Sequence, residues 1–240
     1  MVTGGTRGIG QEMVRQLIRA GAGVMSTGQS SNSVACARNE MPGAQWLVCD
    51  LAHPGSREAL LQWLRQRALD VVIHNAAVQQ ERHWANAHRA GDADALSVAR
   101  EIEINLLAPI ELTRQLLPAL APRPQARIVF VTSGLALAPK SASPVYCATK
   151  AGLRSFAKAL RGQLRACGSS IQVIEALPPL VDTDMTRGRG KGKISAEAAA
   201  RKILAGVAAG RPEIDVGMTR LLRAIMRLSP ALGEAIMIGK

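Results

Sequence analysis

Aromatic residues are almost absent from this chain: phenylalanine, tryptophan and tyrosine together make up 2% of its 240 residues, and there is a single tyrosine. Hydrophobic residues nonetheless reach 48%, which is close to the globular norm. We therefore expect an aliphatic core of Ala, Leu, Ile, Val and Met that folds without disulfides or a structural metal. The length suits one large α/β domain better than two small ones, so we predict a single domain over residues 1–240.

Long apolar runs and cysteine motifs are also missing. No stretch approaches the roughly 18 uninterrupted apolar residues of a transmembrane helix, and a glycine-rich turn that begins at Gly4 leaves no room for a signal peptide. The four cysteines form no C-x-x-C motif and have no metal-ligand spacing with the four histidines. Free thiols are typical of a reducing compartment, so we expect a cytoplasmic protein without a bound metal.

Acidic residues are few relative to basic ones: 18 Asp and Glu against 30 Lys and Arg give a formal net charge of +12. Nucleic-acid binding is one explanation, because a cationic surface releases counterions from phosphate. The basic residues are scattered, however, and no aromatic side chains are interleaved with them for base stacking. We therefore expect no nucleic-acid partner, and a basic proteome or an anionic cofactor explains the charge.

Short apolar or β-branched runs alternate with longer segments of helical periodicity. The predicted strands are Val24–Thr27, Trp46–Val48, Val71–Ile73, Ile128–Thr132, Ile171–Glu175 and Ile214–Val216. The predicted helices are Ile9–Ala20, Ser56–Arg67, Ala93–Leu117, Pro144–Ala166 and Ala196–Ala208. Such alternation indicates βαβ units, so we predict an α/β fold with a doubly wound parallel sheet in three α/β/α layers.

The first strand of this sheet is predicted to be short. Strands usually run about five or six residues, but only Met1, Val2 and Thr3 precede Gly4. Either translation begins further upstream, or the protein tolerates a shortened central strand. In the second case we expect reduced stability.

Residues 3–10 read Thr-Gly-Gly-Thr-Arg-Gly-Ile-Gly, with glycines at positions 4, 8 and 10. Pyrophosphate binding needs a tight turn, a close backbone approach and a helix whose N-terminal amides face the anion. An amphipathic helix follows the turn, and this context favours a dinucleotide site over a plain structural turn. The candidate cofactor-binding residues here are Gly4, Thr6, Arg7, Gly8, Ile9 and Gly10.

The residues after the second and third predicted strands bear on the choice of dinucleotide. An acidic side chain after the second strand would hold the ribose 2′-hydroxyl of NAD, but residues 26–31 contain no carboxylate. Arg7 either binds a 2′-phosphate by charge-assisted hydrogen bonds or lies solvated on the surface. We therefore favour NADP(H) and keep NAD(H) as the alternative. Asp50, next to Leu51, either positions an adenine amino group or caps the following helix.

Tyr146 stands four residues before Lys150, so the two side chains share one face of a helix. A phenol titrates near pH ~10, and lowering its pKa to about 7 takes roughly 4 kcal/mol. A cation about 4 Å away supplies about that much at an effective dielectric near ~20. We predict that Tyr146 is the acid/base of a reaction and that Lys150 lowers its pKa.

Ser133 and Asn105 each have two interpretations. Ser133 follows a predicted strand at the carboxyl edge of the sheet, where ligands bind in open α/β folds. Its hydroxyl either holds a substrate carbonyl oxygen or simply begins a loop. Asn105 lies in the middle of a helical segment, where a buried amide needs partners. A structural kink and a bound water both account for it.

In order and spacing, these residues resemble the short-chain dehydrogenase/reductase family over almost the whole chain, and its DltE-like subgroup in particular. The glycine turn, Asn75-Ala76-Ala77, Tyr146-x-x-x-Lys150 and Pro178-x-x-x-x-Thr183 carry the resemblance. It implies a Rossmann fold and a catalytic tetrad of Asn105, Ser133, Tyr146 and Lys150. It implies that Tyr146 exchanges the proton, Ser133 positions the substrate, Lys150 also binds the nicotinamide ribose, and Asn105 holds a water. The further implied cofactor contacts are Asn75, Ala76, Pro178, Val181 and Thr183.

The chain departs from the family pattern at two places. It has His74-Asn75-Ala76-Ala77 where the family usually has Asn-Asn-Ala-Gly, and Pro178-Pro179 where the family has Pro-Gly. Each change replaces a glycine near the expected cofactor with a bulkier residue.

Three segments bear on substrate and partners. Gln79–Asp94 is expected to overhang the cleft, with His83 and Trp84 either touching substrate or solvated. Met185–Lys193 alternates glycine with basic residues, which indicates either a mobile lid or a solvated loop. The positive charge of a lid would favour an acidic substrate or the cofactor phosphates. The amphipathic segment Met218–Leu228 is expected to pack on its own domain or on another subunit, with membrane-surface attachment as a weaker alternative.

Two functions from different classes follow. The first is an oxidoreductase that moves a hydride between NADP(H) and a small carbonyl or alcohol substrate. The second is a catalytically silent dinucleotide-binding regulator or partner protein. The intact Ser-Tyr-Lys set favours the enzyme. The family resemblance also implies a homodimer or homotetramer formed through Leu106–Leu117 and Cys147–Leu164.

Overall fold

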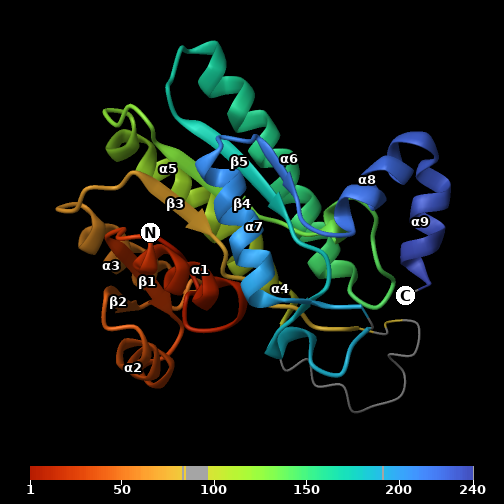
Figure 1. Cartoon of the computed structure of the whole chain (residues 1–240), viewed down its shortest axis with the longest axis horizontal. Coiled ribbons are helices and arrows are strands. Elements are labelled where there is room, and N and C mark those ends of the chain that lie inside the picture. Colours follow the sequence, from red (N-terminus) through yellow and green to blue (C-terminus); the bar gives the residue numbers. More distant parts are fainter. Residues whose placement is uncertain (83, 85–96, 191, 240) are drawn as a thin grey trace.

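A parallel sheet forms the centre of the computed structural model, which describes residues 1–82, 84, 97–190 and 192–239 (Figure 1). Its strands are β1 (Val24–Gly28), β2 (Ala44–Val48), β3 (Val71–His74), β4 (Arg127–Val131), β5 (Gln172–Leu177) and β8 (Glu213–Asp215). They lie in the order β2-β1-β3-β4-β5-β8, with the N-terminal residues bridging β1 and β3. Every paired strand is parallel to its neighbour, which confirms the doubly wound sheet.

Met1–Thr3 occupy the position of a central strand between β1 and β3. The Val2 amide donates to the Met25 carbonyl at 2.9 Å, and the Ile73 amide donates to the Met1 carbonyl at 2.9 Å. The strand is short, as predicted, and the glycine turn follows it at the carboxyl edge of the sheet.

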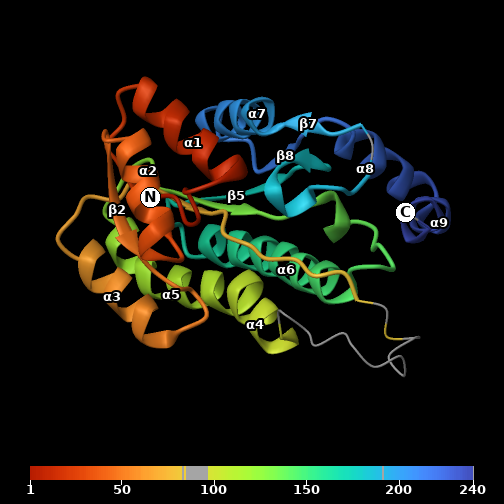
Figure 2. The same ribbon diagram turned by 90° about the horizontal axis from the view of Figure 1, so that it is seen from below.

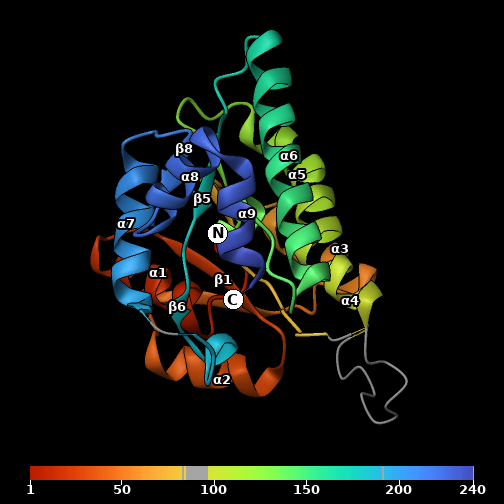
Figure 3. The ribbon, with the colours of Figure 1, turned by 90° about the vertical axis from the view of Figure 1, so that its right-hand side faces the viewer.

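Helices cover both faces of the sheet. Figure 2 shows α1 and α7 on one side and α3, α5 and α6 on the other, and Figure 3 shows the same layering from a second direction. The helices are α1 (Gly8–Arg19), α2 (Ser31–Glu40), α3 (Pro54–Leu64), α4 (Val98–Ile102), α5 (Ala108–Leu120), α6 (Pro144–Ala166), α7 (Ala196–Ala208), α8 (Thr219–Leu228) and α9 (Pro230–Ile238). Among the described residues, no helix is long and apolar enough to cross a membrane.

The predicted helices match α6 and α7 to the residue, but other predictions needed correction. The predicted helix Ala93–Leu117 begins at Val98 within the described residues, and its middle is a π-helical segment, η2 (Glu103–Leu107). The helices α2 and α9 were not predicted. In α2 only Val34 and Ala37 are buried, so its sequence carries little apolar periodicity.

The core is divided between the two faces of the sheet. Along β4, Ile128 and Phe130 join the cluster under α3, α5 and α6, whereas Val129 and Val131 join the cluster under α1 and α7. All four side chains are at most 4% exposed. This strand is apolar on both faces, as expected for a parallel sheet that is covered on both sides.

His74 shows how the chain accommodates one departure from the family pattern. Its ring is 2% exposed and stacks on Phe130 with centroids 5.1 Å apart. Its Nε2 lies 3.0 Å from the Thr113 hydroxyl. Burial lowers the pKa of His74 to about 3, so the ring is neutral at physiological pH.

We expect His74 to make the protein acid-sensitive. The unfolded chain binds a proton at this ring below a pKa of about 6.5, while the folded chain stays neutral, so stability falls as pH falls from about 6.5 toward 3. By pH 5 this group alone removes about 2 kcal/mol. The measurement is urea unfolding of the wild type and His74→Asn at pH 7 and pH 5. The wild type should lose more stability than the variant, and equal losses would contradict this assignment.

The helix α8 packs against the rest of the chain just after the end of β4. A Cβ placed on Gly134 would lie 3.5 Å from the Thr219 hydroxyl and 3.6 Å from Leu222 of α8. Arg223 of the same helix donates to both carboxylate oxygens of Asp215 at 2.7 Å. The amphipathic helix therefore packs on its own chain, which was the first of the predicted alternatives.

Candidate functional site

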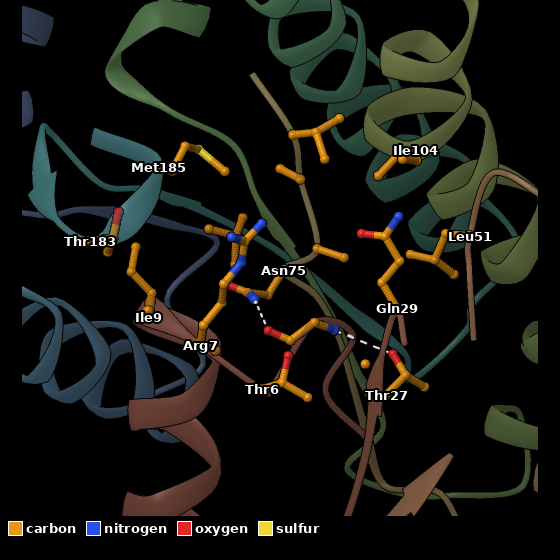
Figure 4. A pocket seen from close by; sticks show the side chains of 18 of the residues that line it. Thr6, Arg7, Ile9, Thr27, Gln29, Leu51, Asn75, Ile104, Thr183 and Met185 are labelled. Atoms are coloured by element: carbon orange, nitrogen blue, oxygen red, sulfur yellow. Dashed lines mark hydrogen bonds between the residues drawn. The ribbon is translucent and has the colours of Figure 1, made fainter. Parts of the chain in front are cut away.

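A cavity of about 370 Å³ opens at the carboxyl edge of the sheet. Figure 4 shows the glycine turn below it, with Thr183 and Met185 to one side and Leu51 and Ile104 to the other. Most of the predicted cofactor and catalytic residues line this cavity: Gly4, Thr6, Arg7, Gly8, Ile9, Gly10, Asp50, Leu51, Asn75, Ala76, Tyr146, Lys150, Pro178 and Thr183. Residues far apart in the sequence are thus brought to one place.

The other three predicted residues are not among those that line the cavity. Asn105 is fully buried, Val181 is 4% exposed, and Ser133 follows β4 beside Tyr146. The structure also adds lining residues that the sequence analysis did not name as site residues: Thr27, Gly28, Gln29, Ser30, Ser33, Cys49, Ala77, Val78, Ile104, Val131, Thr132, Asp184 and Met185. Ser30 and Ser33 form a capping box at the start of α2, and that serine pattern was the available signal for this part of the wall.

Two glycines of the turn occupy positions where a larger residue would not fit, Gly4 because of its backbone conformation and Gly10 because of its close neighbours. Gly4 has φ +68°, a left-handed conformation that favours glycine. A Cβ on Gly10 would lie 2.2 Å from the Gly4 carbonyl oxygen and 2.4 Å from the Asn75 side-chain nitrogen. The turn is therefore folded back on the first residues of α1, with no space for a side chain.

Thr3 and Asn75 hold this turn against the end of β3. The Asn75 side-chain amide donates to the Gly4 carbonyl at 3.2 Å (Figure 4) and to the Thr3 carbonyl at 3.1 Å. In return, the Thr3 hydroxyl accepts hydrogen bonds from the backbone amides of Asn75 and Ala76. Asn75 thus shapes the cavity through the turn.

The first turn of α1 faces the cavity without a side-chain cap. Its N-cap is Arg7, whose side chain makes no capping hydrogen bond, and the first turn contains no acidic residue. Helix N-terminal amides of this kind bind anionic oxygens. Because Gly8, Ile9 and Gly10 all line the cavity, the site fits the pyrophosphate of a dinucleotide.

Asp50 makes contacts that exclude one of its two interpretations. Its carboxylate accepts from the Ala52 amide at 3.0 Å and from Arg100 at 2.6 Å. The N-cap of α3 is His53, not Asp50. Asp50 is therefore not the helix cap, and it lies in the cavity wall. Desolvation raises the pKa of its carboxyl, but Arg100 and the Ala52 amide together outweigh this effect and hold the pKa below its usual value.

Tyr146 and Ser133 lie together, as the sequence predicts. Tyr146 is 8% exposed on the first turn of α6, and burial raises the pKa of its phenol well above its ordinary value. A hydrogen bond with Ser133 and the charge of Arg189 oppose this shift, whereas Glu101 adds to it. The phenol is therefore protonated at neutral pH.

Lys150 lies one helical turn further along α6. Its Nζ donates to the Val131 carbonyl at 2.9 Å and lies 5.6 Å from the centroid of the Tyr146 ring. Burial lowers the pKa of Lys150 to about 8, so its charge is itself sensitive to pH. In this structure the lysine does not offset the burial of the phenol, and the predicted lowering of the tyrosine pKa stays a prediction.

Asn105 lies in the π-helical segment η2, and its side chain fastens this helix to the chain after β3. Its carbonyl oxygen accepts from the Val78 amide at 2.9 Å, and its amide donates to the Val78 carbonyl at 2.8 Å and to the Thr149 hydroxyl at 3.3 Å. Of the two explanations for this residue, the geometry supports a structural link at a helix irregularity.

We expect Asn105→Ala to destabilise the fold. The substitution leaves the half-buried Val78 amide and carbonyl without their Asn105 partners, at a cost of about 2 kcal/mol. For a chain of this size the melting temperature should fall by roughly 4–8 °C. Thermal unfolding followed by circular dichroism measures the change. An unchanged melting temperature with lost turnover would instead favour the water-holding role.

The segments that the sequence assigned to substrate binding are only partly described. His83 and most of Gln79–Asp94 lie outside the described residues, and Trp84 is 56% exposed. In the basic segment Met185–Lys193, Met185 lines the cavity, and Lys193 donates to the Thr186 carbonyl at 2.7 Å.

The amino-acid sequence is similar to a known protein family and to individual bacterial proteins. The family model described as short chain dehydrogenase matches residues 1–193. The uncharacterized oxidoreductase DltE of Bacillus subtilis (strain 168) is 38% identical over 222 residues, which cover 89% of this chain and 86% of that protein. The 3-oxoacyl-[acyl-carrier-protein] reductase FabG of Escherichia coli (strain K12) is 30% identical over 215 residues, covering 88% and 82%.

A solved structure supports the same fold. A short chain dehydrogenase from Burkholderia cenocepacia J2315 in complex with NADP superposes with a TM-score of 0.85 at 23% identity, covering 98% of this chain and 95% of that one. The resemblance that the motifs predicted is therefore confirmed for the family and for the Rossmann-like fold.

Proposed function

The chain belongs to the short-chain dehydrogenase/reductase family, and from that premise we propose that it transfers a hydride between NADP(H) and a small carbonyl or alcohol substrate. One observation carries the proposal: the Tyr146 phenol, its hydrogen bond to Ser133 and the buried Lys150 lie at the same cavity as the uncapped N-terminus of α1. A proton donor and a pyrophosphate-binding helix thus share one cleft.

The chain's own residues explain how a dinucleotide would be held. The amides of the first turn of α1 would bind the pyrophosphate, and the glycine turn would allow the close approach. Asp50 and Leu51 would flank the adenine, while Lys150 would bind the nicotinamide ribose. Asn75, Ala76, Pro178, Val181 and Thr183 would shape the nicotinamide end. When bound, the cofactor supplies or accepts the hydride.

Tyr146 would move the proton. A phenol with a raised pKa is protonated at neutral pH, so it is ready to donate its proton to the oxygen of a carbonyl as that oxygen gains negative charge. Ser133 would hold the same oxygen beside the phenol. Reduction of a carbonyl would use this protonated form of the phenol.

The experiment that tests this function is turnover. Purified protein is mixed with NADPH or NADH and a panel of aldehydes and ketones, and oxidation of the nicotinamide is followed by absorbance. We expect carbonyl-dependent oxidation of NADPH. Nucleotide binding without turnover of any carbonyl would favour the second candidate, a catalytically silent dinucleotide-binding regulator or partner protein.

We expect Arg7→Gln to weaken the preference for NADPH over NADH. Arg7 is exposed and lines the same cavity as Gln29 and Ser30, and residues 26–31 offer no carboxylate for a ribose 2′-hydroxyl. Loss of a charge-assisted bond to a 2′-phosphate should lower NADPH affinity about tenfold and leave NADH affinity unchanged. Fluorescence titration with both nucleotides measures this. Arg19→Gln, at the far end of the helix that Arg7 precedes, is the control, and an equal loss for both nucleotides would contradict the assignment.

Location and assembly complete the proposal. All four cysteines are free, which suits a reducing compartment, and we place the protein in the cytoplasm as one NAD(P)-binding unit of residues 1–240. We also propose a homodimer or homotetramer through α5 and α6. In support, two large apolar side chains just before α5 remain exposed: Ile102 at the end of α4, by 41%, and Leu107 at the end of η2, by 39%.

A further inference from the structure

The basic segment after Thr183 folds against the reaction end of the cavity. Asp184 and Met185 line the cavity directly. Thr186 is buried, its hydroxyl donates to the Val181 carbonyl at 2.5 Å, and its own carbonyl accepts from the Arg189 amide at 3.0 Å. The backbone of Arg189 is thus tied to the cavity wall through Thr186.

Glycines on both sides set the course of the chain at Arg189. Gly188 has φ +75° and Gly190 has φ +58°, conformations that side-chain-bearing residues rarely adopt. The alternation of glycine and basic residues therefore has a geometric meaning here. It turns the chain sharply on each side of one arginine.

The side chain of Arg189 is only partly exposed, by 26%. Its positive charge weakly opposes the rise in the pKa of the buried Tyr146 phenol. Its Nη1 is buried and makes no hydrogen bond to the part of the chain that the structure describes. The nearest carboxylate oxygen with an assigned ion pair is Glu81 Oε1, 3.8 Å from Nη1.

Glu81 is bound more closely by a different cation. The same Oε1 accepts a hydrogen bond from Lys140 Nζ at 2.9 Å. An ion pair at 3.8 Å between side chains exposed by about a quarter and a third contributes little to stability. A carboxylate that offered Arg189 two short parallel hydrogen bonds would compete well with this contact, because the guanidinium matches carboxylate geometry.

We propose that Arg189 is a specificity residue that binds a carboxylate carried by the carbonyl substrate, so that the enzyme prefers acidic aldehydes or ketones to neutral ones. This inference rests on the proposed function. The charge of the basic segment suits either an acidic substrate or the cofactor phosphates, and for Arg189 the substrate is the better match. Glu81 Oε1, which lies 3.8 Å from Arg189 Nη1, accepts from Lys140 Nζ, and the Lys140 amide donates to the Sγ of Cys147, the residue after Tyr146. Arg7 and Ser30 are instead the N-caps of α1 and α2, where the cofactor phosphates are expected.

The test compares two substrate pairs that differ in a carboxylate: succinate semialdehyde with butanal, and 4-carboxybenzaldehyde with benzaldehyde. Each is reduced with NADPH by the wild type, Arg189→Gln and Arg187→Gln. Arg187 is the matched control because it lies two residues away, is 82% exposed and pairs with Asp184. For at least one of the two acidic aldehydes, we expect Arg189→Gln to lower kcat/KM by about 10- to 100-fold, mainly through a higher KM. For the matching neutral aldehyde we expect no change. A similar loss for the neutral aldehyde, or no loss for either acidic one, would overturn the proposal.

A binding measurement separates this inference from the proposed function. NADPH affinity is measured first and should be the same in all three proteins. The melting temperature of the NADP⁺-loaded proteins is then measured with 4-(hydroxymethyl)benzoate and with benzyl alcohol. The benzoate should stabilise the wild type and Arg187→Gln but not Arg189→Gln. If NADP⁺ binds but the benzoate gives no selective stabilisation and turnover shows no preference for acidic substrates, the inference about Arg189 is wrong and the proposed function stands. If no nucleotide binds, the proposed function is wrong as well.

Discussion

Replacing Tyr146 with phenylalanine is expected to lower kcat for carbonyl reduction by about 100- to 10,000-fold, the range that a positioned general acid contributes. The substitution removes only the phenolic hydroxyl, so the proton donor and its hydrogen bond to Ser133 are lost while the ring stays packed. Steady-state kinetics at saturating NADPH measures the change.

The control for this variant is cofactor binding. Tyr146→Phe should bind NADPH with an affinity close to that of the wild type, because the hydroxyl is proposed to act on the substrate oxygen. Retention of more than about a tenth of the wild-type kcat would show that the phenol is not the general acid.

The second large effect is expected for Gly10→Ala, which should weaken NADPH binding about 100-fold. The new Cβ would lie 2.2 Å from the Gly4 carbonyl oxygen. The backbone must therefore move, and the loss of a charge-assisted hydrogen bond between the turn and the pyrophosphate costs up to about 100-fold in affinity. Fluorescence titration with NADPH measures the affinity, and the melting temperature reports the strain.

Gly162→Ala is the matched control for this substitution. Gly162 also lies in a helix, α6, but a Cβ there meets nothing within 4 Å. Alanine at an exposed helical position should raise stability by about 0.5–1 kcal/mol without affecting NADPH. If both alanines behave alike, close packing at the turn is not the reason for glycine at position 10.

The sequence predicted the fold and the location of the site because both depend on local patterns. Apolar periodicity defines α6 and α7, and the glycine spacing places the turn before α1. Parallel strands end at the same edge of a sheet, so residues that follow different strands, such as Asp50, Asn75 and Pro178, meet at one cavity. These are consequences of topology, and the topology follows from the alternation of elements.

The properties that the sequence did not predict depend on tertiary contacts. The role of Asn105 was open because its partner, Val78, lies 27 residues away in the chain. The pKa of Tyr146 depends on burial and on Glu101 and Arg189, which spacing alone does not reveal. The proximity of Lys150 was predicted, but the sequence gives no measure of how far burial lowers the pKa of the lysine itself.

The central claim is that this cleft binds a nicotinamide dinucleotide, and fluorescence titration of the purified protein with NADPH and NADH tests it most directly. The account predicts saturable binding of both nucleotides, with NADPH bound more tightly. Saturable binding of NADH in preference to NADPH would contradict the choice of cofactor, and no binding of either nucleotide would contradict the account as a whole.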